Sequence, residues 1–458
     1  MSLDVVLGIA QGLALTMSVA FLTYVFLIVV PFLRHKPMPV GTSTDFEWHF
    51  LVPCRDEEAV IGGTVRYLRG TFPHAHVWVI DDDSDDRTCG VVRMLRRNGG
   101  RTDKHVHLVP RIRPDARTGK GEALNAAYRA LKDWMGERVD ADRAVLVVVD
   151  ADGRPAPNCL DVCAADHLFG NPAIGAVQVE VRMLNRDRPA AHLRGFKRRI
   201  GSLLVRMQDL EFRTAISAIQ LSRGYTGTIS MGGNGQFTRL SALDSIAGPT
   251  GSPWRGSLLE DFELGVHLLT EGWKTGYTMD TNVDQEALYS MRRFLAQRTR
   301  WGQGTMQCAR YIRRIWASEH LSTIGAAEIM YYLAQPWMQL LGSTIYPVPF
   351  LLTLIRTVQS PGQVAAWFAG GAWILFAIYT VFGLMPFLIW GPIYLKKCEP
   401  KIGWLRAMGY GMIYAGYIYT FYITSWRAVT RLMRGRNGWA KTRRNDELST
   451  SGAVALDH

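Results

Sequence analysis

Cysteine, charge and repeated segments are all scarce in this sequence of 458 residues, and each scarcity excludes a class of protein. Six cysteines in a chain of this size cannot make a disulfide framework, and the spacing of Cys159 and Cys163 suits one face of a helix and matches no zinc motif. Charged residues make up 20% and apolar residues 48%, a composition that excludes extended disorder, collagen and a solvated coiled coil. The sequence also has no internal repeat and no low-complexity linker.

Charge is entirely missing from four long stretches of the chain. These stretches are residues 5–33, 329–355, 357–395 and 407–426. A helix rises 1.5 Å per residue, so about 20 residues cross a hydrocarbon core of about 30 Å. The alternative is a set of buried core helices in a soluble protein. Such helices rarely run for so many residues without a charged side chain. We therefore expect a transmembrane anchor over residues 1–36 and transmembrane or interfacial helices over residues 321–430, with three to five crossings in all.

Basic residues beside these stretches predict how the chain is oriented. The first stretch is too long for a cleaved signal peptide, and Arg34 and Lys36 follow it, so the positive-inside rule places residues 37–320 in the cytosol. The basic tail, residues 431–458, is also expected in the cytosol. Together these features predict a multi-pass protein of the plasma membrane. The side on which the last crossings end stays open, because basic clusters flank both ends of the stretch 407–426.

The excess of basic residues, 52 against 40 acidic ones, fits nucleic acid, an anionic membrane or a phosphorylated small molecule. Much of this excess lies in the tail, beside the charge-free stretches and in the segment 193–213, which mixes arginines with leucines. We interpret this segment as a basic amphipathic helix at the membrane surface, with an ordinary solvated helix as the alternative. The lipid bilayer is therefore an expected partner, and nucleic acid is not.

The region between residues 37 and 320 alternates strand-like and helix-like patterns. Apolar runs rich in Val and Ile occupy residues 50–53, 77–80, 106–109, 144–149 and 174–179, and helical patterns at 57–69, 121–134 and 157–169 lie between them. This order predicts an α/β domain with a doubly wound, mostly parallel sheet. Ligands bind such sheets at the carboxyl ends of the strands, so the polar side chains that follow the strands are the expected site.

A run of carboxylates follows the second of these strands. Asp81, Asp82 and Asp83 come directly after a buried apolar run, where their charges are costly unless something pairs with them. A ligand with N–H and O–H donors, or a cation, would supply that pairing. The alternative is a solvated acidic turn in which Ser84 caps a helix.

Asp150 and Asp152 follow the fourth strand at alternate positions, so both side chains can turn toward one site. Their hard oxygen ligands suit Mg²⁺ or Mn²⁺, particularly where phosphate groups supply the remaining ligands. The sequence therefore predicts a divalent metal site at the end of this strand.

Two glycine-containing segments look like nucleotide motifs but fail the full patterns. Lys120 opens a helix between two glycines, yet Gly121 stands where a P-loop needs Ser or Thr. The segment 232–235, which contains Gly233 and Asn234, is no dinucleotide fingerprint, because Thr238 replaces the third glycine. It either lets a ligand approach the backbone closely or is a plain turn.

An acidic pair and an Arg-Trp pair come later in the chain. Glu260 and Asp261 are followed by Gln297, Arg300 and Trp301. Each group alone is most often a surface or structural feature. Taken in order with Asp81-Asp82 and Asp150-x-Asp152, these groups make the sequence from about residue 50 to residue 307 resemble the membrane-embedded family 2 glycosyltransferases. That group includes the cellulose, chitin, hyaluronan and poly-N-acetylglucosamine synthases.

The resemblance implies a GT-A-like fold and a role for each matching residue. It implies that Pro53, Arg55, Glu57, Asp81, Asp82, Lys120 and Asp150 bind the nucleotide. It implies that Asp152, with Asp150, binds Mg²⁺ or Mn²⁺, and that Asp261, beside Glu260, is the general base. It implies that Gln297, Arg300 and Trp301 hold the diphosphate and the acceptor, near Gly233 and Asn234. Two positions depart from the family pattern: Asp83 replaces a common Gly, and Leu259 replaces a common Thr.

We therefore expect an inverting, metal-dependent, processive glycosyltransferase. It would polymerise a β-linked polysaccharide from UDP-glucose or UDP-N-acetylglucosamine, with the growing glycan as acceptor, and pass the product across the membrane. The first alternative is a non-processive enzyme that transfers one sugar to a lipid carrier. The second is a non-catalytic membrane protein that senses a nucleotide sugar.

Overall fold

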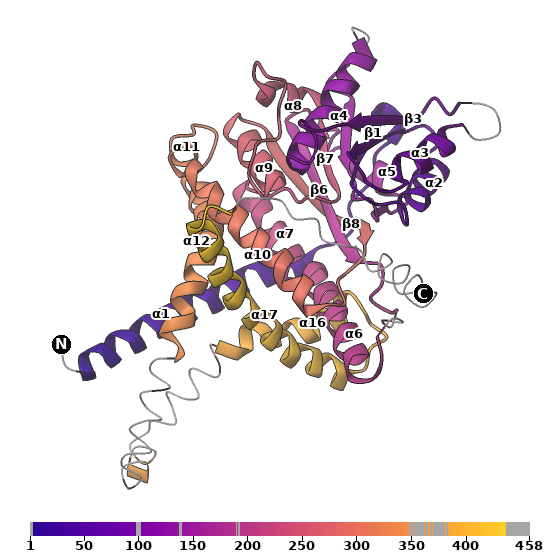
Figure 1. Ribbon diagram of the computed structural model, residues 1–458. Coiled ribbons are helices and arrows are strands. Elements are labelled where there is room, and N and C mark those ends of the chain that lie inside the picture. Colours follow the sequence, from indigo (N-terminus) through magenta and orange to yellow (C-terminus); the bar gives the residue numbers. More distant parts are fainter. Residues whose placement is uncertain are drawn as a thin grey trace.

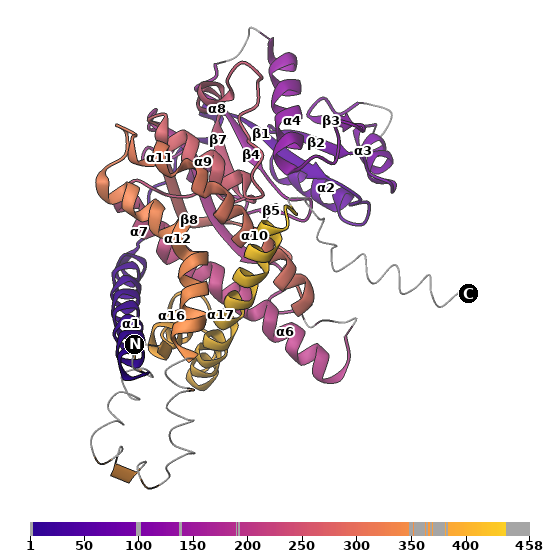
Figure 2. The same cartoon turned by 60° about the vertical axis from the view of Figure 1, so that its left-hand side comes forward.

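The structure is a computed structural model that describes residues 3–97, 102–136, 140–188, 190, 193–347 and 383–436, with single positions between 351 and 381. A sheet forms the upper part of the molecule, and long helices lie below it (Figures 1 and 2). The predicted stretch 357–395 and the tail beyond residue 436 lie largely outside the described residues.

The sheet has eight strands within the described residues, in the spatial order β3-β2-β1-β4-β7-β6-β8-β5. In chain order the strands are β1 Glu47–Cys54, β2 His76–Asp82, β3 Val106–Arg111, β4 Ala144–Val148, β5 Arg154–Pro155, β6 Ile174–Met183, β7 Gln236–Arg239 and β8 Lys274–Gln285. Strands β3, β2, β1 and β4 run parallel to one another, and β6 runs parallel to β8. The α/β fold is therefore confirmed, and all five predicted strands are present.

The sheet is more mixed than the sequence predicts. Strand β7 runs antiparallel to both β4 and β6, and β5 runs antiparallel to β8. Sequence patterns could not show β7, because it has only four residues and directly follows the glycine-rich segment 232–235. Its position matters for function, since it brings that segment beside the end of β4.

Helices cover both faces of the sheet because successive strand residues point to opposite faces. On one face, Phe50 and Val52 pack with α2 (Ile61–Thr71) and α5 (Cys159–Cys163). On the other face, Leu51 packs in a core with α4 (Lys120–Met135), α8 (Leu240–Ala247) and α9 (Glu260–Thr270). Helix α3 (Thr88–Arg96) packs beside α2 and β3. Burial of both faces is the main source of stability in such a layered domain.

Two predicted helices differ from the observed ones. The helix expected at 57–69 begins at Ile61, and the helix expected at 157–169 ends at Cys163. After Cys163 the chain turns, which places Leu168 and Phe169 in the core of the sheet. The helix ends here because burial of these two side chains in the core outweighs the local preference for helix.

The remaining helices lie below or beside the sheet, and their apolar faces meet in two clusters. In chain order they are α1 (Leu3–Arg34), α6 (Gly195–Leu210), a π-helix (Glu211–Ile216), α7 (Ser217–Thr226), α10 (Met291–Cys308), α11 (Ile312–Trp316), α12 (Thr323–Ile345), α16 (Trp390–Lys397) and α17 (Trp404–Met433). Side chains of α1, α6, α10, α16 and α17 make one apolar cluster. Short 3₁₀ turns at Ser43–Asp45 and Ala309–Tyr311 complete the described elements.

The described residues contain one helix that is long and apolar enough to cross a membrane, residues Gly12–Arg34 of α1. Helices α12 and α17 have the necessary length but do not reach the required hydropathy, since tyrosine, glycine and other weakly apolar residues interrupt them. Within the described residues, absence of charge alone is therefore not sufficient to identify a span. The prediction of three to five crossings is not confirmed, and the N-terminal anchor stays a prediction.

Candidate active site

One cavity of about 1120 Å³ opens where the carboxyl ends of the central strands meet the lower helices. Most of the residues singled out in the sequence line it. They are Pro53, Arg55, Glu57, Asp82, Lys120, Asp150, Gly233, Asn234, Glu260, Asp261, Gln297, Arg300 and Trp301. Asp81 and Asp152 are buried beside this cavity, each 6% exposed, and do not line it. The fold thus brings together residues that are up to about 250 positions apart in the sequence.

Lys120 connects two parts of the site at the first residue of α4. Its Nζ donates to Asp150 Oδ1 at 2.7 Å and to the Gly233 carbonyl at 2.6 Å. Burial alone would lower the pKa of Lys120, but the charges of Asp150, Glu260 and Asp261 raise it above its ordinary value. Lys120 is therefore a fixed cation between the strand-end carboxylates and those of α9.

Gly233 allows these groups to approach one another. A Cβ at this position would lie 3.1 Å from Asp261 Oδ2 and 3.1 Å from Lys120 Nζ. A side chain there would displace one of the two charged groups. The glycine-rich segment is therefore a close-approach element of the site and is more than a plain turn.

The acidic pair occupies the first turn of α9, where the helix dipole favours negative charge. The Phe262 N–H donates to Asp261 Oδ1 at 2.7 Å and orients this carboxylate. Burial raises the pKa of Asp261, and burial followed by the charge of Asp261 raises the pKa of Glu260. Lys120 opposes both increases. A carboxyl group with a raised pKa can exchange protons near neutral pH, as a general base must.

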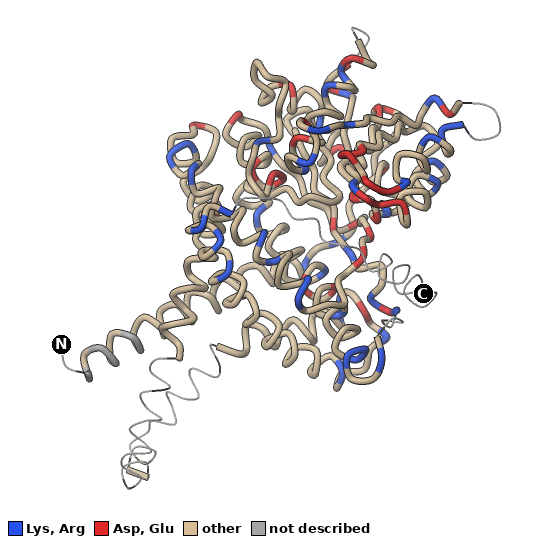
Figure 3. The backbone as a smooth tube through the Cα atoms, in the orientation of Figure 1, with Lys and Arg blue, Asp and Glu red and all other residues tan. Residues whose placement is uncertain are grey.

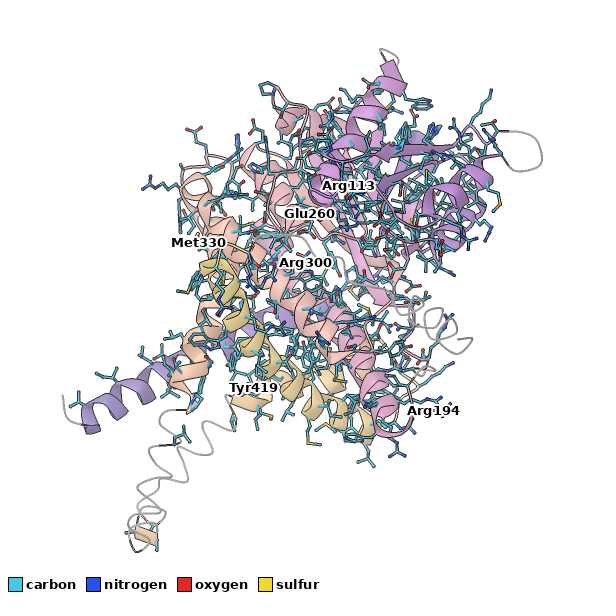
Figure 4. All side chains as sticks on the ribbon, in the orientation of Figure 1. Arg113, Arg194, Glu260, Arg300, Met330 and Tyr419 are labelled. Carbon is cyan, nitrogen blue, oxygen red and sulfur yellow. The ribbon has the colours of Figure 1, made fainter. Side chains whose placement is uncertain are left out.

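Helix α10 contributes the Gln297, Arg300 and Trp301 side chains from below the sheet. Figure 4 shows Arg300 beside Glu260, between the sheet and the lower helices. Burial lowers the pKa of Arg300, while the charges of Glu260 and Asp150 act in the opposite direction. An arginine in this setting can bind a diphosphate, whose charge offsets the cost of burial.

Arg298, between these residues in the sequence, has a different role that the sequence did not indicate. Its guanidinium donates to both carboxylate oxygens of Glu211, at 2.9 and 2.6 Å. The same guanidinium lies 4.2 Å from the ring centroid of Trp301. Tyr417 of α17 also donates to Glu211. This buried network fixes α10 and supports one face of the Trp301 ring.

The acidic run after β2 is neutralised by the chain itself. Arg111 forms an ion pair with Asp82, and the Arg117 N–H donates to the same carboxylate at 3.0 Å. Arg113 lies 2.6 Å from Asp83, and this acidic and basic grouping is visible at the right of Figure 3. Residues 111–117 thus supply positive charge to Asp82 and Asp83 from within the chain, and pairing of the run with an external ligand or cation stays a prediction.

The proposed N-cap at Ser84 is also wrong. Helix α3 begins at Thr88, and Ser84 donates to Asp81 while accepting from the Asp56 N–H. The position after the aspartate pair, Asp83, has a φ of 59°, a left-handed conformation that explains why glycine is common there. The ion pair with Arg113 accompanies this strained conformation in the present chain.

Two glutamines that sequence reasoning missed hold the segment 232–235 in place. Gln178 accepts from the Gly232 N–H at 2.7 Å and donates to the Asn234 carbonyl at 2.9 Å. Gln285 accepts from the Asn234 amide at 2.9 Å, and Asn234 in turn accepts from the Asp150 N–H at 3.2 Å. Gln178 lies in β6 and Gln285 is the last residue of β8. Gln178 interrupts the apolar run 174–179, which was the available signal for that residue.

Asp150 and Asp152 are the predicted donors for a divalent ion. Asp152 Oδ2 accepts from the Glu286 N–H at 3.1 Å, which orients its carboxylate. No cluster of three or more His, Cys, Asp or Glu ligands is found in the part of the chain that the structure describes. Two carboxylates without a full protein cage fit Mg²⁺ or Mn²⁺ that is completed by substrate phosphates and water. The residues present therefore fit the predicted ion.

The architecture is shared with a solved enzyme. The mannosyltransferase PcManGT from Pyrobaculum calidifontis, determined with GDP-Man and Mn²⁺, is 18% identical, and the match covers 90% of this chain and 98% of that chain with a TM-score of 0.53. This likeness defines the class: the fold is an α/β, GT-A-like glycosyltransferase fold.

A family model described as glycosyltransferase like family 2 matches residues 48–304, more than half of the chain. The chain belongs to this family of glycosyltransferases. The predicted enzyme class is thereby confirmed, and so is the resemblance at the level of the family.

Curated relatives show what the chain is similar to within the family. The β-monoglucosyldiacylglycerol synthase of Synechocystis sp. is 29% identical over 56% of this chain and 47% of its own length. A probable glucomannan 4-β-mannosyltransferase of Arabidopsis thaliana is 26% identical over 50% of this chain and 47% of its own length. The chain spans about half the length of these relatives. The finer resemblance to processive synthases is not confirmed.

Proposed function

We propose that this protein transfers a single hexose, with inversion, from a UDP-sugar to the hydroxyl group of a membrane lipid. The observation that supports the proposal most is the extent of the cavity. It runs from Asp150 at the end of β4 and Asp261 at the start of α9 to three apolar residues of α1, the helix with the composition of a membrane span: Phe21, Val25 and Ile28. A lipid could therefore enter with its chains among apolar helices and its hydroxyl at the carboxylates.

The relatives favour a lipid acceptor over a polymer. The Synechocystis relative is named for a lipid that carries one glucose, which makes UDP-glucose the first donor to test and diacylglycerol the first acceptor. Membrane attachment of this chain is part of the proposal and depends on α1. The earlier alternative, single transfer to a lipid, thus replaces polymerisation as the main hypothesis.

The chemistry follows from the residues around the cavity. Asp261 takes the proton of the acceptor hydroxyl, and the oxygen of that hydroxyl forms a bond to the anomeric carbon. The bond between this carbon and the diphosphate oxygen breaks, and its electron pair leaves with UDP. Attack from the side opposite UDP inverts the anomeric carbon, so an α-linked donor gives a β-linked product. Arg300 and Gln297 would hold the diphosphate, and Lys120 keeps Asp150 in position.

The metal site is part of the same proposal. Asp150 and Asp152 would hold Mg²⁺ or Mn²⁺, which stabilises charge on the departing diphosphate when it is bound. Pro53, Arg55, Glu57 and Asp82 line the part of the cavity proposed for the nucleoside. Asp81, which accepts from Ser84, would support Asp82 without contacting the base itself.

The test is product analysis with the full chain in lipid nanodiscs. Labelled UDP-glucose, Mn²⁺ and diacylglycerol should yield an organic-soluble lipid with one hexose by mass spectrometry. EDTA should abolish the product, and added Mn²⁺ should restore it. Asp261→Asn should lower the rate by about 10²–10⁴-fold, the usual contribution of a general base, while Asp244→Asn on the surface should not. A water-insoluble polymer, or UDP release without a glycolipid, would refute the proposal.

Processive polymerisation stays a second candidate because of the cavity wall. Trp301 lines the cavity together with the polar side chains Gln335 and Gln339 of α12, and such a surface also suits a row of sugar rings. This candidate predicts products of many hexose units in the same assay. The non-catalytic alternative is disfavoured, since the chain belongs to a glycosyltransferase family.

A further inference from the structure

A second cleft, of about 620 Å³, lies between α6 and α17. Arg186, Arg198, Arg199 and Arg206 line it, together with Tyr410 of α17. Figure 4 labels Arg194 at the start of α6, at the lower end of the helical layer and well below Glu260 and Arg300. None of the four arginines lines the catalytic cavity. We call this feature the arginine cleft.

Two of the arginines are held by neighbours and form its rigid part. Arg206 pairs with Asp187 and donates to the Tyr394 hydroxyl at 3.1 Å. Arg186 lies 3.3 Å from Glu399. These contacts hold both guanidinium groups in place without any ligand.

The other two arginines are not neutralised. Arg198 and Arg199 are exposed on α6, and neither forms an ion pair with any residue that the structure describes. Asp187 and Glu399 pair with the other two arginines of the cleft, and Glu399 also pairs with Arg213 at 2.6 Å. The surplus of positive charge is concentrated here, as the blue backbone at the lower right of Figure 3 shows. Such a surplus needs an anionic partner.

Apolar side chains next to the cleft indicate where that anion comes from. Phe196 is 76% exposed and precedes Arg198 by two residues, and Ile200 is 40% exposed. At the start of α17, Trp404 is 59% and Leu405 is 86% exposed. Exposed aromatic and aliphatic residues beside arginines are typical of helices that lie in the headgroup region of a bilayer. A site for a soluble anion would not require them.

We propose that the arginine cleft binds the phosphate group of an anionic membrane phospholipid. Arg198 and Arg199 donate to the phosphate oxygens, because the guanidinium fork matches phosphate geometry. Phe196 and Trp404 enter the interfacial layer on either side of the headgroup. The site is separate from the sugar-transfer cavity, so it does not depend on which donor or acceptor the enzyme uses.

The experiment measures binding of short-chain phospholipids to the purified full chain in a neutral detergent, by microscale thermophoresis. Dioctanoyl phosphatidylglycerol should bind and dioctanoyl phosphatidylcholine should bind at least about tenfold more weakly, as expected when each nearby cation contributes to attraction of an anionic lipid. The double variant Arg198→Gln/Arg199→Gln should lose about tenfold or more in affinity for phosphatidylglycerol. Glycerol 3-phosphate, which has the phosphate without acyl chains, should bind much more weakly than the dioctanoyl lipid.

A matched control separates the cleft from general surface charge. Arg93→Gln/Arg96→Gln removes the same charge from exposed positions of α3, on the catalytic domain, and should leave lipid affinity unchanged. The double variant Arg198→Lys/Arg199→Lys keeps the charge but loses the planar guanidinium groups. It should bind phosphatidylglycerol with intermediate affinity. Equal binding of the neutral lipid, equal loss in the α3 control, or binding of glycerol 3-phosphate as tight as that of the lipid would overturn the proposal.

Discussion

Single charged side chains determine the protonation state of the site, and Lys120 is the one that can be tested most directly. Asp261 acts as a base only when it is ionised, and burial raises its pKa, so turnover should fall as the pH is lowered through this raised value. Lys120 lowers the pKa of both Asp261 and Glu260. Lys120→Gln should therefore move the acid limb of the pH profile of kcat to higher pH, by about one unit.

Lys132→Gln is the control, because Lys132 lies on the same helix and its side chain is 45% exposed in a surface pair with Asp244. This variant should leave the acid limb unchanged. A limb that stays in place or moves to lower pH in Lys120→Gln would contradict the assignment. The sign for stability is opposite to that of an ordinary ion-paired carboxylate, because the folded state binds these protons more tightly than the unfolded chain does. The free energy of unfolding should therefore fall as the pH rises from the ordinary carboxyl pKa to the raised one.

Substitutions of two neighbouring arginines of α10 should have different effects, one on stability and the other on turnover. Removing Arg298 leaves the buried carboxylate of Glu211 without its bidentate partner, so Arg298→Gln should lower the free energy of unfolding by about 3–5 kcal/mol. Arg300→Gln should lower turnover by roughly a hundredfold, the usual effect of losing one donor to a charged leaving group, with little effect on stability. Thermal unfolding and initial rates measure the two effects. Equal losses of stability in both variants would contradict this division.

At the scale of elements, the close packing of α10 on the start of α9 joins the two parts of the site. A Cβ on Gly304 would lie 2.6 Å from Leu259 Cβ and 2.8 Å from the Leu259 nitrogen. Leu259 immediately precedes the acidic pair, and its side chain makes no capping hydrogen bond to α9. The contact thus sets the distance between the carboxylates of α9 and the Arg300 side chain of α10.

Gly304→Ala should force these helices apart and lower the free energy of unfolding by about 1–3 kcal/mol, with a loss of turnover. Gly302→Ala, two residues away on the same helix, meets only Ala428 Cβ at 3.6 Å. This control should be stabilised by up to about 1 kcal/mol, because alanine is the better helix former. Melting temperatures of the two variants should therefore shift in opposite directions, and shifts of the same sign and size would refute the argument.

At the scale of the whole molecule, a single cavity connects the sheet with the helices below it. Met338 of α12 lines this cavity, whereas Leu341 on the same helix is 48% exposed. Met338→Trp should fill part of the acceptor path and lower transfer to a long-chain lipid about tenfold, equivalent to a loss of about 1.4 kcal/mol in binding.

Leu341→Trp is the matched control and should retain transfer. Release of UDP without a lipid acceptor should be the same in both variants, since the donor part of the cavity is not changed. Loss of UDP release in Met338→Trp would show that the substitution disturbs the catalytic centre, and unchanged lipid transfer would show that the acceptor does not use this path.

The sequence by itself determined the α/β class, the five predicted strands and the family, because strand alternation and short motifs are local properties. It also identified most of the candidate site residues, and thirteen of them line one cavity. Its prediction of three to five membrane crossings is not confirmed, because among the described residues one helix combines absence of charge with sufficient hydropathy.

Only the tertiary structure decided which charges pair. Glu211 and Arg298 are 87 residues apart, Lys120 and Gly233 are 113 apart, and no local pattern relates such positions. The antiparallel direction of β7 and the neutralisation of Asp82 by Arg111 have the same origin. These contacts depend on packing of distant elements, since the burial of charge is tolerated only where the complete fold supplies its partner.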